Sequence, residues 1–238
     1  MTALDRPGRR GLLAAAGVGL LLPGAAFADE KKGNGAGEEK SVGAVEDLMR
    51  EHGVLRRALL VYLESVPKIH QARATFDAAA LGQTARLFRS FGEDYHEKKL
   101  EEAYIFPTVK KAGGPAAAYV DTLIAQHDRG REVTDYIANV TRNGKIAAGN
   151  AEPLVHALST FVLMYQNHTA REDTIVFPAW KTALSGKRLD ELGDKFEEIE
   201  KQQFGTDGYE DAVKQIGEIE QRLGLADLAQ FTAPPPRG

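Results

Sequence analysis

The chain has 238 residues, of which 43% are hydrophobic, and its formal net charge is −4 at pH 7. This length and hydrophobic content suit one or two folded domains. The absence of cysteine excludes disulfide bonds, thiolate-bound metal clusters and cysteine nucleophiles. No basic block or stripe of alternating basic and aromatic residues appears, so we expect no nucleic-acid partner.

The first 28 residues are typical of an export signal. Basic residues precede the apolar run 11–22, which is too short to cross a bilayer, and residues 26–28 form a small-x-small cleavage site. We therefore predict a signal peptide over residues 1–28, a periplasmic or secreted location and no stable membrane span after cleavage. The adjacent Arg9 and Arg10 resemble a twin-arginine export signal, whose route carries folded proteins and would allow metal loading before export. An uncleaved membrane anchor is the alternative.

The rest of the chain is predicted to be almost entirely helical. Residues 29–43 are polar and glycine-rich, which predicts a flexible linker. From residue 44 the apolar residues recur at helical spacing, and no alternating β-branched run predicts a strand. Four long helices with short connections predict an all-α, antiparallel four-helix bundle over residues 44–184. The helices are expected at about 44–65, 76–111, 116–142 and 152–184, with Pro67 ending the first.

The C-terminal part, residues 185–238, is predicted to form a helical extension and a proline-rich tail. Two further helices are expected over about 187–223, broken at 204–210, and packed on the outside of the bundle. The last residues contain three consecutive prolines, which lack the backbone N–H that a helix needs.

Two similar motifs stand in the second and fourth predicted helices. The segments 96–107 and 168–178 both run from a histidine through a pair of acids to Phe-Pro. Each predicted hairpin also carries a histidine on its first helix, His52 or His127. We therefore interpret the bundle as two copies of one αα-hairpin.

The histidines lie on the apolar faces of their predicted helices. His52, His127 and His168 each stand three, four or seven residues from apolar residues, and Glu172 lies four residues after His168. A bound cation removes the cost of burying so many ionisable groups, because carboxylate and neutral imidazole then become ligands. Nitrogen and oxygen ligands without sulfur suit iron, manganese or zinc. Two glutamates shared between two sets of histidines suit a dinuclear centre.

This duplicated pattern of histidine, histidine, glutamate, a second acid and Phe-Pro resembles the hemerythrin-like HHE cation-binding family over roughly residues 44–184. The resemblance implies a hemerythrin-like bundle of two αα-hairpins with a non-haem di-iron centre that binds or senses O₂, NO or peroxide. It implies that Glu101 and Glu172 bridge the two metal ions. Carried over by position, the metal ligands are His52, His96, Glu101, His127, His168 and Glu172.

The first repeat departs from the family pattern in its spacing. His96 lies five residues before Glu101, not four, so the two side chains diverge by about 140° on a regular helix instead of about 40°. A one-residue π-bulge between Glu97 and Leu100 would restore the match. The alternative is that Glu97 takes part in metal binding.

The third predicted helix lacks the extra histidine that oxygen-carrying hemerythrins have one turn away. Here the neighbours of His127 are Leu123 and Arg131. Water, Glu97 or a tyrosine would then complete the metal coordination, and Tyr165 is placed to reach the site. This departure disfavours simple reversible oxygen carriage.

The residues after the bridging glutamates have their own expected roles. Pro107 and Pro178 each delete a helix hydrogen bond, and we expect paired kinks that open space around the metals at one end of the bundle. The phenylalanine before each proline would plug that end, with plain core packing as the alternative. The second acids, Glu102 and Asp173, are expected on a solvated face.

Four functions stay open on the sequence. The favoured one is a di-iron protein that binds or senses a small diatomic ligand or peroxide, with two iron ions as cofactor and other divalent metals as alternatives. A peroxidase or oxidase on the same scaffold is the second. An iron storage or repair protein is the third, and a metal-free interaction bundle is the fourth.

Overall fold

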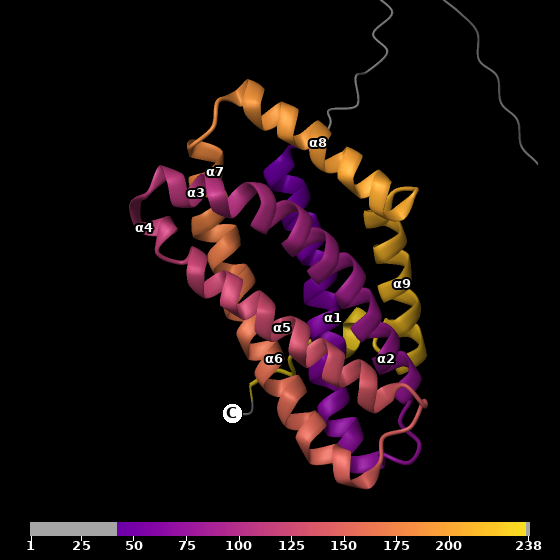
Figure 1. Cartoon of the computed structure of the whole chain (residues 1–238). Coiled ribbons are helices and arrows are strands. Elements are labelled where there is room, and N and C mark those ends of the chain that lie inside the picture. Colours follow the sequence, from indigo (N-terminus) through magenta and orange to yellow (C-terminus); the bar gives the residue numbers. More distant parts are fainter. Residues whose placement is uncertain (1–41, 237–238) are drawn as a thin grey trace, which may run out of the picture. The chain divides into compact units, whose positions relative to one another are not determined.

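The computed structural model describes residues 42–236, which form helices and no strand (Figure 1). This confirms the predicted all-α class. Four helical rods build the bundle, and three of them are composite. Their bounds are α1 (Ala44–Ala72); α2 (Ala78–Leu87), η1 (Phe88–Ile105) and α3 (Phe106–Ala112); α4 (Gly114–Ala117) and α5 (Val120–Thr141); and α6 (Ala151–Arg171), η3 (Glu172–Val176) and α7 (Phe177–Thr182).

Short connections return each rod along the one before it. α1 packs against α6, α2 packs against α5, and α5 packs against α6, so the four rods enclose one core. The turn between α3 and α4 is made by Gly113 and Gly114, whose φ angles of 77° and 78° favour glycine. The two hairpins expected from the sequence are therefore the two halves of this bundle.

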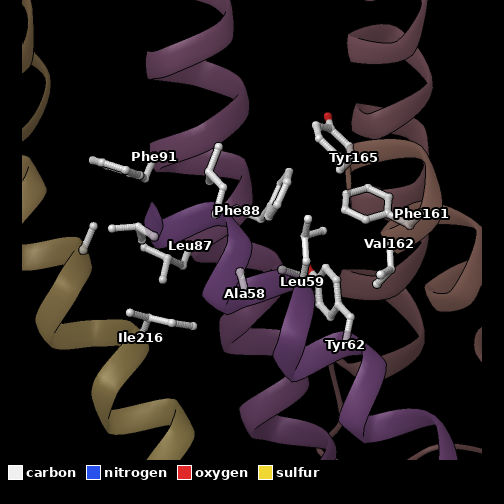
Figure 2. Close-up of a cluster of buried hydrophobic side chains, with 14 of the residues drawn as sticks. Ala58, Leu59, Tyr62, Leu87, Phe88, Phe91, Phe161, Val162, Tyr165 and Ile216 are labelled. Carbon is white, nitrogen blue, oxygen red and sulfur yellow. The ribbon is translucent and has the colours of Figure 1, made fainter. Parts of the chain in front are cut away.

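An aromatic cluster fills part of the core (Figure 2). The Phe88 ring lies edge-on to both Phe161 and Tyr165, at centroid distances of 5.0 and 4.9 Å. Tyr62 from α1 meets Phe161 edge-on at 5.5 Å. Edge-to-face contacts of this kind add about 0.5–1.5 kcal/mol per pair beyond the burial of the rings. The cluster fixes α1, η1 and α6 against one another, and these elements carry most of the site residues.

α1 continues through Pro67 to Ala72, so the predicted end of the first helix at residue 65 is wrong. Pro67 lies on the exposed side of α1, and Ile69, two residues later, is buried in the core. A proline inside a helix costs about 3 kcal/mol, whereas burial of an isoleucine side chain stabilises by about 1.5–3 kcal/mol. Water can also hydrate the carbonyl group that the proline leaves without a donor, because that face is open.

The helical rods change hydrogen-bond pattern at both Phe-Pro motifs. η1 is a π-helix over Phe88–Ile105, much longer than the single bulge predicted, and η3 is a π-helix over Glu172–Val176. At their ends the N–H groups of Phe106 and Phe177 donate to carbonyl groups five residues earlier, instead of four. A proline follows each and offers no N–H to resume the α-helical pattern in that turn.

Two further helices cover one side of the bundle, as expected. α8 (Gly186–Phe204) packs on α1 and η1, and α9 (Gly208–Leu223) packs on α1 and α2. The break between them begins at Gly205, which has a left-handed backbone, and the Asp207 side chain caps the start of α9. A short 3₁₀-helix, η4 (Leu228–Phe231), precedes an extended tail.

No described helix is both long and apolar enough to span a membrane. The predicted signal peptide, residues 1–28, and nearly all of the predicted linker lie outside the described residues. Both stay predictions.

Candidate metal centre

The six residues predicted as metal ligands meet in one buried cluster between the four rods. α1, α5 and α6 supply His52, His127 and His168. η1 supplies His96 and Glu101, and η3 supplies Glu172. Their side chains are at most 3% exposed. Groups of these residues have donor atoms close enough to share a metal ion.

The histidines form two pairs, one in each hairpin. The Nε2 atoms of His52 and His96 lie 3.0 Å apart, and those of His127 and His168 lie 3.0 Å apart. All four Nε2 atoms therefore point inward, toward the two glutamates. This is the side of the imidazole ring that a metal ion would meet.

Each glutamate spans the two histidine pairs. Glu101 Oε1 lies 3.3 Å from His96 Nε2 and 4.0 Å from His52 Nε2, whereas Oε2 lies 3.3 Å from His127 Nε2. Glu172 places Oε2 3.6 Å from His52 Nε2 and Oε1 3.0 Å from His168 Nε2. Two carboxylates that each face both histidine pairs suit a dinuclear centre, because each could contact two metal ions.

The oxygen atoms of these glutamates are the strongest sign that the site holds cations. All four oxygens of Glu101 and Glu172 are buried and have no hydrogen-bond partner. A buried carboxylate without partners costs several kcal/mol, and native proteins rarely leave one in this state. Two metal ions between the histidine pairs would satisfy all four oxygens, so the residues present fit a dinuclear metal group.

Burial and the neighbouring charges shift the pKa values of the two glutamates in opposite directions. Burial, together with the nearby charge of Glu101, raises the pKa of Glu172 well above its usual range. Burial alone would raise the pKa of Glu101, but His96 and His127 outweigh it and hold this pKa well below its usual range. Without a cation, the site must therefore keep protons to balance its charge.

The pKa values of the histidines are shifted as well, in both directions. Burial would lower the pKa of His96 and His127, but the glutamates beside them reverse the shift. The pKa of His96 rises well above its usual range, and that of His127 rises to about 10. His168 behaves oppositely, because burial and the charge of His127 lower its pKa well below its usual range.

The outward-facing nitrogens of the first-helix histidines bind the acids Asp173 and Glu102. His52 Nδ1 donates to Asp173 at 2.7 Å, and His127 Nδ1 donates to Glu102 at 3.1 Å. The expectation that these acids lie on a solvated face is wrong, since their side chains are only 15% and 14% exposed. Each acid orients a histidine ring so that Nε2 points into the centre.

Two residues of the centre have no counterpart in the sequence prediction. His96 Nδ1 donates to Glu51, and His168 Nδ1 donates to Gln126 at 2.9 Å. Both residues stand directly before the first histidine of their hairpin. The duplication of the hairpin was the signal that could have found them.

Glu97 lies on the outer side of His127, away from the space between the histidine pairs. Its Oε1 accepts a hydrogen bond of 2.7 Å from the Tyr165 hydroxyl, and its Oε2 lies 3.3 Å from Arg131 Nη2. Oε2 is 3.9 Å from His127 Nδ1, the nitrogen that points away from the centre. In this geometry Glu101, not Glu97, is the first-repeat carboxylate that faces the Nε2 atoms of the histidines. Tyr165 contacts the centre directly, because its ring lies 5.3 Å from that of His168.

Phe106 and Phe177 close one side of the centre. The Phe177 ring stacks on His52 at 5.3 Å, and the Phe106 ring stacks on His127 at 5.5 Å. Both phenylalanines are buried. They cover this side of the centre and belong to the continuous hydrophobic core, so the alternative of core packing holds for both.

Comparison with known proteins agrees with this geometry. A family model described as the hemerythrin HHE cation binding domain matches residues 43–180. The chain belongs to this family. Similar curated proteins include uncharacterised protein Rv1995 of Mycobacterium tuberculosis and uncharacterised protein Mb2018 of Mycobacterium bovis. Each is 39% identical over 196 residues, which cover 82% of this hemerythrin-family chain and 76% of the relative. The comparison with solved structures gives no match.

Proposed function

We propose that this hemerythrin-family protein is a non-haem di-iron protein that binds or senses O₂, NO or peroxide. The observation that carries the proposal is the pair of buried glutamates whose four oxygens lack partners between two histidine pairs. Bound iron would supply a redox-active position for a small ligand. We also propose that the protein works in the cell envelope, as its N-terminal sequence predicts.

The chain's own residues would hold the metal ions in place and exclude bulk water from them. The four histidines would hold the metals through Nε2, and their Nδ1 partners fix the orientation of each ring. Glu101 and Glu172 would bridge the two positions. Phe106 and Phe177 cover the rings of His127 and His52 and keep bulk water from that side.

Peroxide turnover is the second candidate. The oxygen-carrying hemerythrins that this chain resembles have an extra histidine one turn from the position of His127, where this chain has Leu123 and Arg131. The Arg131 guanidinium pairs with Glu102 and Glu97. The centre thus offers four histidines, two at each position. Fewer nitrogen ligands favour peroxide chemistry or sensing over simple oxygen carriage.

Metal analysis of the purified protein, produced with ample iron, tests the first proposal. We expect about two irons per chain, with an ultraviolet-visible spectrum that changes when azide is added. Glu172→Gln should lose iron, because it removes a bridging carboxylate. His70→Ala is the matched control, since His70 is exposed and pairs with Glu152 outside the centre.

The outcomes separate the candidates. A folded protein without bound metal, or a Glu172→Gln variant with full iron content, would contradict the di-iron proposal. Tight iron with turnover of peroxide in the presence of a reductant would favour the enzyme, whereas weak, exchangeable iron would favour storage or repair.

A further inference from the structure

The two halves of the centre are alike in geometry but differ in charge. In each half, one histidine donates its Nδ1 hydrogen to an acid that is itself paired with an arginine. Asp173 pairs with Arg56, and Glu102 pairs with Arg131. Glu97, the other acid near His127 Nδ1, also pairs with Arg131, and Glu102 has a second basic partner in Lys98. Each of these three carboxylates therefore has a basic partner that compensates its charge.

The second histidine of each half breaks the symmetry. His168 donates to the neutral amide of Gln126, whereas His96 donates to the carboxylate of Glu51. The Glu51 side chain is buried, and its other oxygen accepts a hydrogen bond of 2.9 Å from the Tyr95 hydroxyl. Between Val42 and Pro236, no lysine or arginine forms an ion pair with Glu51. The His52–His96 half therefore carries one additional, uncompensated carboxylate.

A buried carboxylate at this position acts on a metal ion through the imidazole ring. It makes Nε2 of His96 a stronger donor, because it withdraws the hydrogen of Nδ1. It also adds a negative charge where the surroundings screen charge poorly, and such a charge favours the more positive oxidation state of a metal. The half-buried amide of Gln126 adds no net charge to His168.

We propose that Glu51 makes the two metal positions of this centre unequal. Resting on the proposed di-iron function, the position at His52 and His96 binds the first metal ion more tightly and is oxidised at the lower potential. The position at His127 and His168 fills second and is oxidised at the higher potential. Glu51 is a positioning residue in this proposal, because it acts on the metal only through His96.

The chain offers a matched exchange to test this. Glu51→Gln removes the carboxylate but keeps an acceptor for His96, and the Tyr95 hydroxyl can rotate to accept from the new amide. Gln126→Glu places a carboxylate on the corresponding atom of His168. The double variant moves the asymmetry to the other half of the centre without changing the total charge.

The measurements are anaerobic titration of the metal-free full chain with ferrous iron, followed by spectroelectrochemical titration of the iron-loaded protein. Loss of a partner outside the metal ligands typically weakens metal affinity 10–100-fold. We therefore expect Glu51→Gln to weaken the tighter binding step by about that factor and to raise the lower of the two potentials. Gln126→Glu should tighten the weaker step and lower the higher potential, and the double variant should again show two unequal steps.

Specific results would overturn the proposal. Two unequal steps that do not change in Glu51→Gln would assign the inequality to another group. Equal shifts of both steps in either variant would show a general effect on the fold or on net charge. Failure of the unmodified protein to bind iron would instead contradict the di-iron function itself. Gln126→Glu decides the matter even where Glu51→Gln fails to fold, because an unchanged weaker step in that variant contradicts the proposed mechanism.

Discussion

Gly130 leaves the space that the Tyr165 side chain occupies beside the centre. A Cβ atom built on this glycine would lie 2.1 Å from the Tyr165 hydroxyl oxygen, closer than any real Cβ contact. Tyr165 needs this space to donate its hydrogen bond to Glu97. Glycine at position 130 therefore allows the close approach of α5 and α6 beside His127.

We predict that Gly130→Ala destabilises the protein. The new methyl group displaces Tyr165 and leaves a buried carboxylate oxygen without its donor, at a cost of about 1–3 kcal/mol. The better helix propensity of alanine offsets up to about 1 kcal/mol of this. Chemical denaturation measures the difference in the free energy of unfolding.

Gly217→Ala in α9 is the control for that substitution. Its nearest neighbour is Arg57 Nη2 at 3.6 Å, an ordinary contact distance, so alanine should stabilise by about 0.4–1 kcal/mol. If Gly130→Ala were as stable as Gly217→Ala, the close approach at Tyr165 would not be a constraint on the fold.

At the scale of single residues, the sequence predicts which side chains lie on the inner face of one helix. It does not predict contacts that depend on how two helices are rotated against each other. The six candidate ligands follow from the apolar faces, the repeat and the family resemblance, and the structure brings them together. The role of Asp173 depends on how η3 is rotated against α1, because its partner His52 lies 121 residues away. No spacing within one helix reports that rotation, so the solvated face expected for Asp173 was wrong.

At the scale of the helices, one ion pair links the covering helix α9 to the bundle. Arg57 of α1 and Glu220 of α9 form a bidentate ion pair, in which Arg57 Nε donates to Glu220 Oε1 at 2.9 Å and Nη2 donates to Oε2. The pair joins the bundle to its covering helix. Both side chains are only partly exposed, which reduces screening by water.

We predict a measurable coupling between these two residues. A double-mutant cycle with Arg57→Ala and Glu220→Ala should give a coupling energy of about 0.5–1 kcal/mol, at the upper end of values for ion pairs near the surface. The matched control is Arg129 and Glu132, a pair within α5 that is well exposed on both sides and should give almost no coupling. Equal values for the two pairs would mean that this contact does not help to hold α9 on the bundle.

At the same scale, the positions of the helices were largely predictable, and their internal hydrogen-bond pattern was not. Apolar spacing predicted the four rods and the two covering helices. The five-residue gap between His96 and Glu101 predicted a π-turn, but not its extension over Phe88–Ile105. Residue spacing within one helix does not give the length of that segment. The prediction from Pro67 was wrong for a related reason, because the burial of Ile69, two residues later, depends on contacts with the rest of the core.

For the whole molecule, the shifted acidities connect metal binding to pH. In the metal-free protein, the pKa of His127 is raised to about 10, so this histidine holds a proton near pH 7. The pKa values of His96 and Glu172 are also raised well above their usual ranges, that of His96 by the glutamates beside it against the effect of burial and that of Glu172 by burial, and both shifts favour the protonated form. A metal ion competes with these protons for the same oxygens and nitrogens. Metal binding must then release protons, and affinity must rise with pH.

We predict that the apparent affinity for ferrous iron increases between pH 6 and pH 8, by about tenfold per pH unit for each proton displaced. Anaerobic calorimetry in buffers of different ionisation enthalpy counts the protons released. An affinity that is constant over this range, with no proton release, would contradict the protonation of the metal-free centre.

Each hairpin supplies only one of the two side chains that bind the Nδ1 atoms of its own histidines. His52 receives its orienting acid from the second hairpin, and His127 receives its acid from the first. Either hairpin alone would therefore be an incomplete binding site, but two identical copies of one ancestral hairpin, paired about a two-fold axis, would have completed each other. The two hairpins of this chain exchange their acids in this reciprocal way. They differ at Glu51 and Gln126, which stand at corresponding positions and bind the second histidine of their own hairpin.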